Sequence, residues 1–343
     1  FITVFLLNIG AGGIDISLPL FQRYAIDNFV EGQTVEGLGV FALAYTAAIC
    51  LQTVITIVFC RLSMKNEMYI GRDMKHDCFV HLQTLSFSYY NVTPVGYILA
   101  RVMSDTNRIA GMLAWQLTDM TWQIGYVFGV FIAMLFLNVK LALMVMVVVP
   151  LLVILTIYFQ KRILLWNRKI RRQNSKITSA YNEGITGAKT SKTLVIVDQN
   201  CREFEELTTE MRVAGVRAAR LRGIFLPLML LLSSIVTAVV LNQGGHMVLG
   251  GLMALGTLSA FTTYAVGIFE PIQNLAANIS ELISAQANIE RVMDLLDEKP
   301  MIEDSPEVVA KYGTAFEPKK ENWEPIKGEI EFKDVSFKYP DGG

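Results

Sequence analysis

The chain contains six apolar runs that are each long enough to cross a lipid bilayer. Each holds about 18 or more residues with few charges, which is the length an α-helix needs to cross ~30 Å of hydrocarbon. Hydrophobic residues make up 52% of the 343 residues and charged residues 18%, whereas a soluble domain carries about a quarter charged residues. We therefore predict an all-α polytopic membrane protein whose spans cover residues 1–21, 38–60, 112–137, 141–159, 224–241 and 252–269.

Net charge and cysteine usage add two expectations. The formal net charge of −1 gives no overall basic balance, so we expect no nucleic-acid partner. Cys50 and Cys60 lie in an apolar run and Cys78 and Cys201 in charged segments, which favours free thiols over a disulfide framework.

The chain begins without Met inside an apolar run, so we expect the natural N-terminus to lie upstream.

Lysine and arginine predict the orientation of the spans. Connections 31–37 and 242–251 contain neither residue, and connection 138–140 contains one lysine. The two other connections are long and basic. Because basic residues concentrate in cytoplasmic loops, we expect the two long connections to be cytoplasmic. An even number of spans then places both termini on the cytoplasmic side.

Both long connections have the composition of helical hairpins. The first breaks where Pro94 and Gly96 mark a turn. The second, Lys161 to Arg222, contains no proline and is predicted to turn between Gly184 and Lys192. At ~1.5 Å per residue, a helix from Lys161 to Ile185 extends roughly 36 Å beyond the membrane. We therefore expect two helical extensions, each with a short segment at its tip.

The last part of the chain changes character twice. The helical pattern continues past the sixth span to residue 296, which closes a predicted transmembrane domain of residues 1–296. Residues 297–327 are rich in proline, glycine and charge and are predicted to be a linker. Apolar residues then alternate through Ile330, Phe332 and Val335 to Phe337 and Tyr339. This alternation predicts that residues 328–343 form the first strand of a new soluble domain.

The closing sequence GEIEFKDVSFKYP resembles the first strand of the nucleotide-binding domain of ATP-binding cassette (ABC) transporters of the exporter type. In that family the aromatic residue at the position of Tyr339 stacks on the adenine ring of ATP. An aromatic face packs on a purine at low conformational cost. The alternative for Tyr339 is an ordinary packed tyrosine at a strand edge.

The two hairpin tips resemble the same family. YYNVTPVGYILARVMSDTNRI is similar to its first cytoplasmic loop and NEGITGAKTSKTL to its second, each built around a short coupling helix. One departure is Val197, where an acidic residue is common and where Asp198 follows directly. The alternative is that these charges form ordinary solvated helix faces. The resemblance implies coupling roles for Gly96, Arg101, Asp105, Glu183, Gly187 and Lys192.

Catalytic motifs of that family are missing from the chain. There is no G-x-x-x-x-G-K-[ST] phosphate loop, no aspartate placed to hold Mg²⁺ and no switch histidine. We therefore expect no catalytic residue and no metal site here. ATP and Mg²⁺, which the resemblance implies, would be bound mainly by sequence outside this chain, which we expect to be the membrane portion of a longer protein.

Polar residues inside the predicted spans are candidates for a substrate pathway, because such residues are costly in a membrane. The alternatives are that Asp15 pairs with a neighbouring helix and that Trp115 and Asp119 lie at the membrane interface. Pro150, Pro227 and Pro271 are either hinges or static kinks. The residues that we expect to line a central cavity are Asp15, Trp122, Tyr126, Tyr264, Glu270 and Asn274.

The resemblance implies one half of an ATP-driven exporter in a prokaryotic plasma membrane. Its partners would be membrane lipids, a hydrophobic or amphipathic substrate such as a small molecule, lipid or peptide, and a second half-transporter subunit. Exporters with a long acidic linker of this kind resemble paired subunits, so the resemblance favours a heterodimer over a homodimer. Two alternatives stay open, namely a regulatory or sensing subunit of a heterodimeric complex, whose nucleotide site could be degenerate, and an exporter-fold importer of metal chelates.

Overall fold

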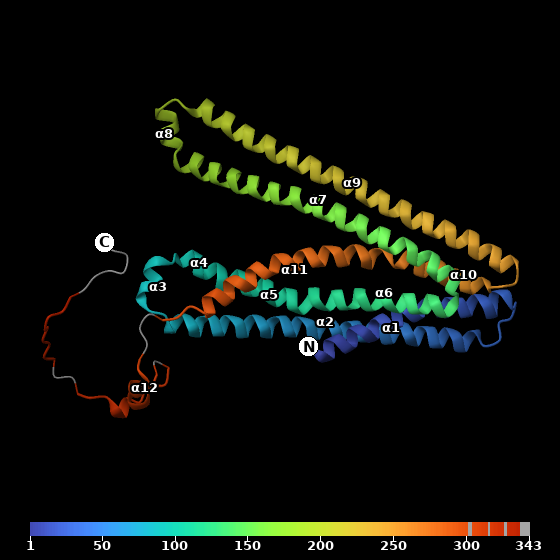
Figure 1. The fold of residues 1–343 in the computed structure, drawn as a ribbon, viewed down its shortest axis with the longest axis horizontal. Coiled ribbons are helices and arrows are strands. Elements are labelled where there is room, and N and C mark those ends of the chain that lie inside the picture. The colour runs from blue at the N-terminus through green and yellow to red at the C-terminus, as the bar shows by residue number, and fades with distance from the viewer. Residues whose placement is uncertain (301–303, 315, 326–327, 337–343) are drawn as a thin grey trace.

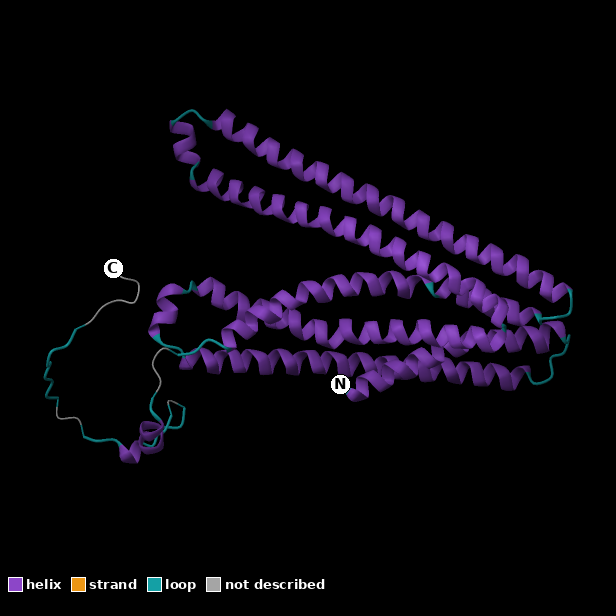
Figure 2. Ribbon diagram, viewed as in Figure 1, coloured by secondary structure: helices purple, strands orange, loops and turns teal. Residues whose placement is uncertain are grey.

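The computed structural model describes residues 1–300, 304–314, 316–325 and 328–336. Within these ranges the regular secondary structure is helical, apart from one isolated bridge between Gly313 and Pro318. The predicted all-α fold is therefore confirmed. Figure 2 shows long helices throughout, with loops gathered at the two ends of the molecule and in the C-terminal segment.

Twelve α-helices lie in the described part of the chain. Three π-helical turns, Ile26–Glu31, Ala100–Asp105 and Met112–Gln116, and one 3₁₀ turn, Lys320–Asn322, connect or extend them. The α-helices are α1 (Ile2–Ala25), α2 (Leu38–Thr84), α3 (Phe87–Val92), α4 (Val95–Leu99), α5 (Thr106–Gly111), α6 (Leu117–Leu137), α7 (Val139–Thr186), α8 (Ala188–Thr193), α9 (Val197–Leu249), α10 (Leu255–Gly267), α11 (Phe269–Leu296) and α12 (Pro306–Tyr312).

Five helical segments of the described chain are long and apolar enough to cross a membrane. They contain the first five predicted spans. The sixth predicted span, over 252–269, stays a prediction, and the helix there is interrupted, because α10 ends at Gly267 and α11 begins at Phe269. Pro271 explains the break, since a proline ring clashes with the carbonyl four residues before it, here that of Gly267. By contrast, α7 and α9 continue through Pro150 and Pro227 without interruption.

The helices run along the long axis of the molecule between two unlike ends (Figure 1). One end, here the turn end, carries the short connections between α1 and α2, α6 and α7, and α9 and α10. The other, the tip end, carries α3 and α4 (the first tip) and α8 (the second tip). The α7–α9 pair packs against the other helices near the turn end and diverges from them toward α8. We call this pair the α7–α9 arm.

Two buried clusters hold the helices together. The larger joins α6, α7, α9 and α10 and includes the fully buried side chains of Met134, Leu141 and Phe261. The smaller lies near the first tip and joins α2, α4, α5 and α11 through residues such as Leu82, Ile98 and Leu295. Burial of one such apolar side chain stabilises a fold by about 1.5–3 kcal/mol. The first tip is therefore packed onto α2, α5 and α11. These belong to the helices outside the arm, which we call the bundle. The second tip is carried on the arm alone.

The C-terminal segment differs from its prediction. The predicted linker contains α12, whose N-cap Ser305 accepts a hydrogen bond from the amide of Val308 at 3.4 Å. Residues 328–336 form no strand, since an isolated strand has no neighbour to pair its backbone groups. Phe337 and Tyr339 lie outside the described residues, and the predicted domain boundaries stay predictions.

Candidate functional site

The first tip is built on Pro94, which begins α4 where the sequence predicted a turn. Gly96 is exposed in α4. The guanidinium of Arg101 lies 4.1 Å from the ring centroid of Tyr97 and donates to its hydroxyl at 2.5 Å. This contact is intrahelical and stiffens the π-helical turn that follows α4.

An ion pair joins this tip to α11. Asp105 is buried and accepts two hydrogen bonds from Arg291, at 2.7 Å from Nε and 2.9 Å from Nη2. The hydrogen bond and the negative charge of Asp105 raise the pKa of Arg291. Arg291 also donates to the side chain of Asn288 at 2.5 Å. Sequence reasoning identified Asp105 but missed Arg291, because nothing local in the sequence links residues this far apart.

The second tip is exposed. The amide of Gly187 donates to the carbonyl of Glu183 at 2.7 Å and ends α7. The Glu183 side chain accepts from Ser179 at 3.5 Å, and Lys192 points from α8 into solvent-accessible space. The three predicted coupling residues therefore follow one another from the last turn of α7, through the break at Gly187, into α8. The two tips share one end of the molecule but sit on separate bodies (Figure 1).

Three of the predicted pathway residues gather between α1, α2 and α6. Asp15 accepts hydrogen bonds from Trp122, at 3.2 Å, and from Gln52, which sequence reasoning missed. The Trp122 ring stacks on Tyr126 with centroids 5.2 Å apart. Asp15 thus pairs with neighbouring helices, which was the alternative considered for it. Trp115, for which a position at the membrane interface was the alternative, donates a hydrogen bond to Glu67 of α2 at 2.9 Å.

The other three predicted pathway residues are placed differently. Tyr264 is fully buried in α10 and donates to the backbone carbonyl of Ile16 at 2.5 Å. In this conformation it is a packing residue that joins α10 to α1. Glu270 and Asn274 are exposed on α11.

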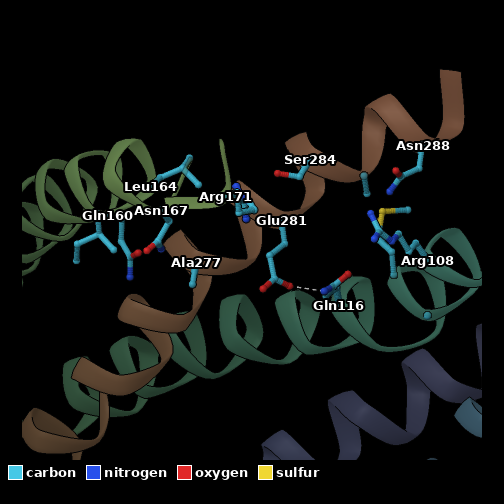
Figure 3. Close-up of a pocket in the computed structure, with 14 residues that line it drawn as sticks. Arg108, Gln116, Gln160, Leu164, Asn167, Arg171, Ala277, Glu281, Ser284 and Asn288 are labelled. Atoms are coloured by element: carbon cyan, nitrogen blue, oxygen red, sulfur yellow. Dashed lines mark hydrogen bonds between the residues drawn. The ribbon is translucent and has the colours of Figure 1, made fainter. Parts of the chain in front are cut away.

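A pocket of about 670 Å³ lies between α5 with the π-helical turn after it, α7 and α11 (Figure 3). Gln116 donates a hydrogen bond to the carboxylate of Glu281 across it. Apolar side chains, among them Met112, Ile163 and Leu164, also line it. None of the predicted pathway residues does. Its charged and amide-bearing walls include Arg108, Gln116, Gln160, Asn167, Arg171 and Glu281.

The face of α11 that lines the pocket nevertheless also carries two predicted pathway residues. Glu270 and Asn274 are followed at alternating steps of three and four residues by the lining residues Ala277, Glu281, Ser284 and Asn288. Residues at this spacing lie on one face of a helix. The spacing was visible in the sequence. The predicted pathway ended at Asn274 and did not include the same face beyond it.

The described residues bear on the two implied cofactors, Mg²⁺ and ATP, in different ways. Among these residues, no group of three or more histidine, cysteine or acidic residues could hold a metal ion. Tyr339, the predicted adenine contact, lies outside them. The place where ATP would bind therefore stays a prediction.

Curated relatives are similar over most of this chain. It is 30% identical over 283 residues to a probable multidrug resistance ABC transporter ATP-binding/permease protein of Bacillus subtilis, covering 80% of this chain and 39% of the relative. It is 28% identical over 273 residues to an ATP-dependent lipid A-core flippase of Desulfotalea psychrophila, covering 79% and 45%. A putative ABC transporter ATP-binding protein of Streptococcus pneumoniae is 28% identical over 325 residues, covering 94% and 53%. The chain thus spans about half the length of the curated relatives it matches.

The match to a protein family agrees with the helical architecture. The family described as the ABC transporter transmembrane region matches residues 1–272, which is most of the chain. The apolar helices, the two tips and the family match all indicate the membrane domain of an ABC transporter. The chain therefore belongs to the ABC transporter transmembrane family and is a multi-pass membrane domain of the exporter type.

Proposed function

We propose that this chain is the membrane half of an ATP-driven exporter that moves amphipathic small molecules, lipids or peptides by alternating access. The observation that carries the proposal is the α11 face from Glu270 to Asn288, because it runs from the predicted membrane pathway into the pocket. A ligand could follow this face between the inner membrane surface and the membrane interior.

The pocket has one wall on the α7–α9 arm and another on the helices that carry the first tip. Gln160, Asn167 and Arg171 belong to the α7–α9 arm, whereas Arg108 and Glu281 belong to the bundle that carries the first tip. A displacement of α8 relative to α3 and α4 would therefore change the width of the pocket. Two arrangements of rigid helix bodies, biased by a ligand, are sufficient for alternating access.

The proposal includes the nucleotide-binding domains and a partner subunit. Nucleotide-binding domains would dock on the two tips through Gly96, Arg101, Glu183, Gly187 and Lys192. ATP and Mg²⁺ would bind to those domains. A second half-transporter, more readily a different chain than an identical one, would complete the cavity. We place the protein in a prokaryotic plasma membrane, in contact with its lipids and with both termini in the cytoplasm.

The named activities of two relatives support the substrate class. One is described as a multidrug resistance transporter and the other as a lipid A-core flippase. Both descriptions imply amphipathic cargo. The pocket of this chain, which combines apolar and charged walls, suits cargo of that kind.

The test is ATP-dependent transport by the full-length protein, alone and with its candidate partner, in sealed proteoliposomes. We expect ATP to move a fluorescent amphiphile away from the side that hydrolyses it, and a non-hydrolysable ATP analogue to abolish sustained movement. Movement toward that side would identify an importer. Amphiphile-stimulated ATP hydrolysis without transport would identify a regulatory or sensing subunit, and either result would refute the export proposal.

A Lys192→Glu variant tests the second tip in the same vesicles, with Lys189→Glu as the control one turn away in α8. We expect Lys192→Glu to reduce transport while leaving ATP binding unchanged. Equal loss in both variants would indicate that the charge of α8, and not Lys192, matters.

A further inference from the structure

Two arginines of the pocket have no acidic partner. Arg108 of α5 and Arg171 of α7 are both exposed, and no ion pair joins either guanidinium to a carboxylate in the described chain. The carboxylate of Glu281 accepts a hydrogen bond from Gln116. With two guanidiniums and one engaged carboxylate, the walls carry a net positive charge of about one, which disfavours a cation and favours an anion.

Charge is distributed unevenly along the pocket. On α7 the lining residues run from Gln160 and Leu164, next to the membrane span, to Arg171 toward the tip. The antiparallel segment that leads into α6 places Gln116 toward the span and Arg108 toward the tip. Figure 3 shows Gln160, Leu164 and Ala277 toward one end of the pocket, Arg171 next to them on the side of Glu281, and Arg108 at the other end. The end next to the membrane is therefore neutral and the tip end is basic.

Length along the helices leaves room for more than a single ion. Gln160 and Arg171 are eleven residues apart on one continuous helix, which is roughly 17 Å at ~1.5 Å per residue. A simple inorganic anion would fill only the basic end. An anion with an apolar tail would fill both.

We propose that this pocket binds an amphiphile by its anionic head, a carboxylate or phosphate attracted by the positive charges of Arg108 and Arg171, with the tail directed along Leu164 and Ala277 toward the membrane. This inference rests on the proposed function and specifies its substrate class. Guanidinium groups suit the head because they bind carboxylates and phosphates through paired hydrogen bonds.

A neighbouring contact supports the basic end. Asn288, which is buried and lines the pocket, accepts a hydrogen bond from Arg291, and Arg291 is held by Asp105. The ion pair between Asp105 and Arg291 thus holds the wall of α11 that carries Asn288, which lies at the Arg108 end of the pocket (Figure 3). An anionic head that binds Arg171 would draw the arm toward this wall, which is the movement that narrows the pocket.

The experiment compares four probes with the same twelve-carbon chain on the full-length protein in proteoliposomes. These are dodecanoate, dodecyl phosphate, dodecyltrimethylammonium and dodecyl maltoside, each assayed for stimulation of ATP hydrolysis and for transport. We expect the two anions to act at the lowest concentration. Arg108→Gln and Arg171→Gln should each raise the half-maximal concentration of the anions about tenfold and leave that of the maltoside unchanged.

Matched controls keep the result interpretable. Arg168→Gln removes a cation from the same helix as Arg171 but outside this pocket, and it should change nothing. Arg171→Lys retains the charge and should lie between the native protein and Arg171→Gln, even if the glutamine variant fails to fold. Inorganic phosphate should not stimulate hydrolysis, and if it does so as well as dodecyl phosphate, the tail has no role.

The outcomes separate this inference from the proposed function. If the cationic or neutral probe is transported best, or if the arginine variants handle the anions normally, the inference is overturned while export of amphiphiles stands. Should no probe of any charge be transported or stimulate hydrolysis, the proposed function itself fails.

Discussion

Arg291 and Asp105 form a two-point ion pair that joins the C-terminal end of α11 to the first tip. Both guanidinium bonds are short, at 2.7 and 2.9 Å. Asp105 is buried, whereas 38% of the Arg291 side chain is exposed. The helix that leads to the C-terminal segment is thereby tied to the turn that carries a predicted coupling residue.

Arg291→Met should lower the free energy of unfolding by about 2 kcal/mol. The loss of the cation leaves a buried carboxylate without a partner, and partial exposure of Arg291 keeps the cost below the ~3–5 kcal/mol of a fully buried pair. Thermal unfolding of the purified protein in one detergent measures the change as a lower Tm.

Arg72→Met is the control for this variant, because Arg72 pairs with Asp73 at an exposed site. Exposed pairs contribute little, so its Tm should stay near the native value. A double variant with Asp105→Asn should recover part of the loss caused by Arg291→Met. If both arginine variants shift Tm equally, the buried pair has no special role.

The sequence predicted the parts of this fold that depend on local composition. Apolar length located the spans, and Pro94 and Gly187 located the tips, since these residues act on the backbone next to them. It could not predict the pairing of Asp105 with Arg291, which are 186 residues apart. The pocket also escaped prediction, because its walls come from three helices whose arrangement is set by packing. Tyr264 appeared polar in sequence and is buried because Ile16 of another helix supplies an acceptor.

Gly256→Ala should destabilise the contact between α1 and α10. The Gly256 amide donates to Asp27 at 2.7 Å, and a Cβ there would lie 2.8 Å from the Asp27 Cγ and would also contact the carbonyl of Arg23. Overpacking of this kind costs about 1–3 kcal/mol. Gly245→Ala is the control, since a Cβ on α9 at that position meets no atom within 4 Å. The control should unfold at the native Tm or slightly above it, because alanine favours a helix by ~1 kcal/mol over glycine. Equal Tm values for both variants would contradict the close approach.

Two cysteines test the proposed orientation and the packing of α2 together. Cys201 is exposed on α9, whereas Cys78 is buried in the smaller cluster. Burial, reinforced by the charge of Asp77, raises the pKa of the Cys78 thiol, so less of it is thiolate at a given pH. In variants that keep one cysteine, a membrane-impermeant thiol reagent should label Cys201 only after cells are opened. Cys78 should label only after unfolding, at any pH up to about 8. Labelling of Cys201 in intact cells would place the second tip outside the cytoplasm.

Tyr339→Ala in the full-length protein should raise the KM for ATP roughly fivefold or more, because stacking of a base on an aromatic ring contributes about 1–3 kcal/mol. Tyr339→Phe is the control, since it keeps the aromatic face and loses only the hydroxyl, and it should behave as the native protein. A KM that is unchanged in the alanine variant would assign Tyr339 to strand packing instead of adenine binding.

Glu270→Gln tests whether the pathway continues from the pocket into the membrane. Glu270 shares one face of α11 with the lining residues Ala277 and Glu281, so a ligand on this face would pass its carboxylate. A hydrogen bond from a ligand hydroxyl to a charged group contributes ~1.5 kcal/mol, and its loss should raise the half-maximal concentration for stimulation by the neutral dodecyl maltoside about tenfold without changing basal ATP hydrolysis. Glu290→Gln is the matched control, because it removes the same charge from the same helix at a position about 200° around its axis. If the two variants respond alike, the face from Glu270 to Asn288 is not a pathway, and the pocket ends where α11 meets the membrane.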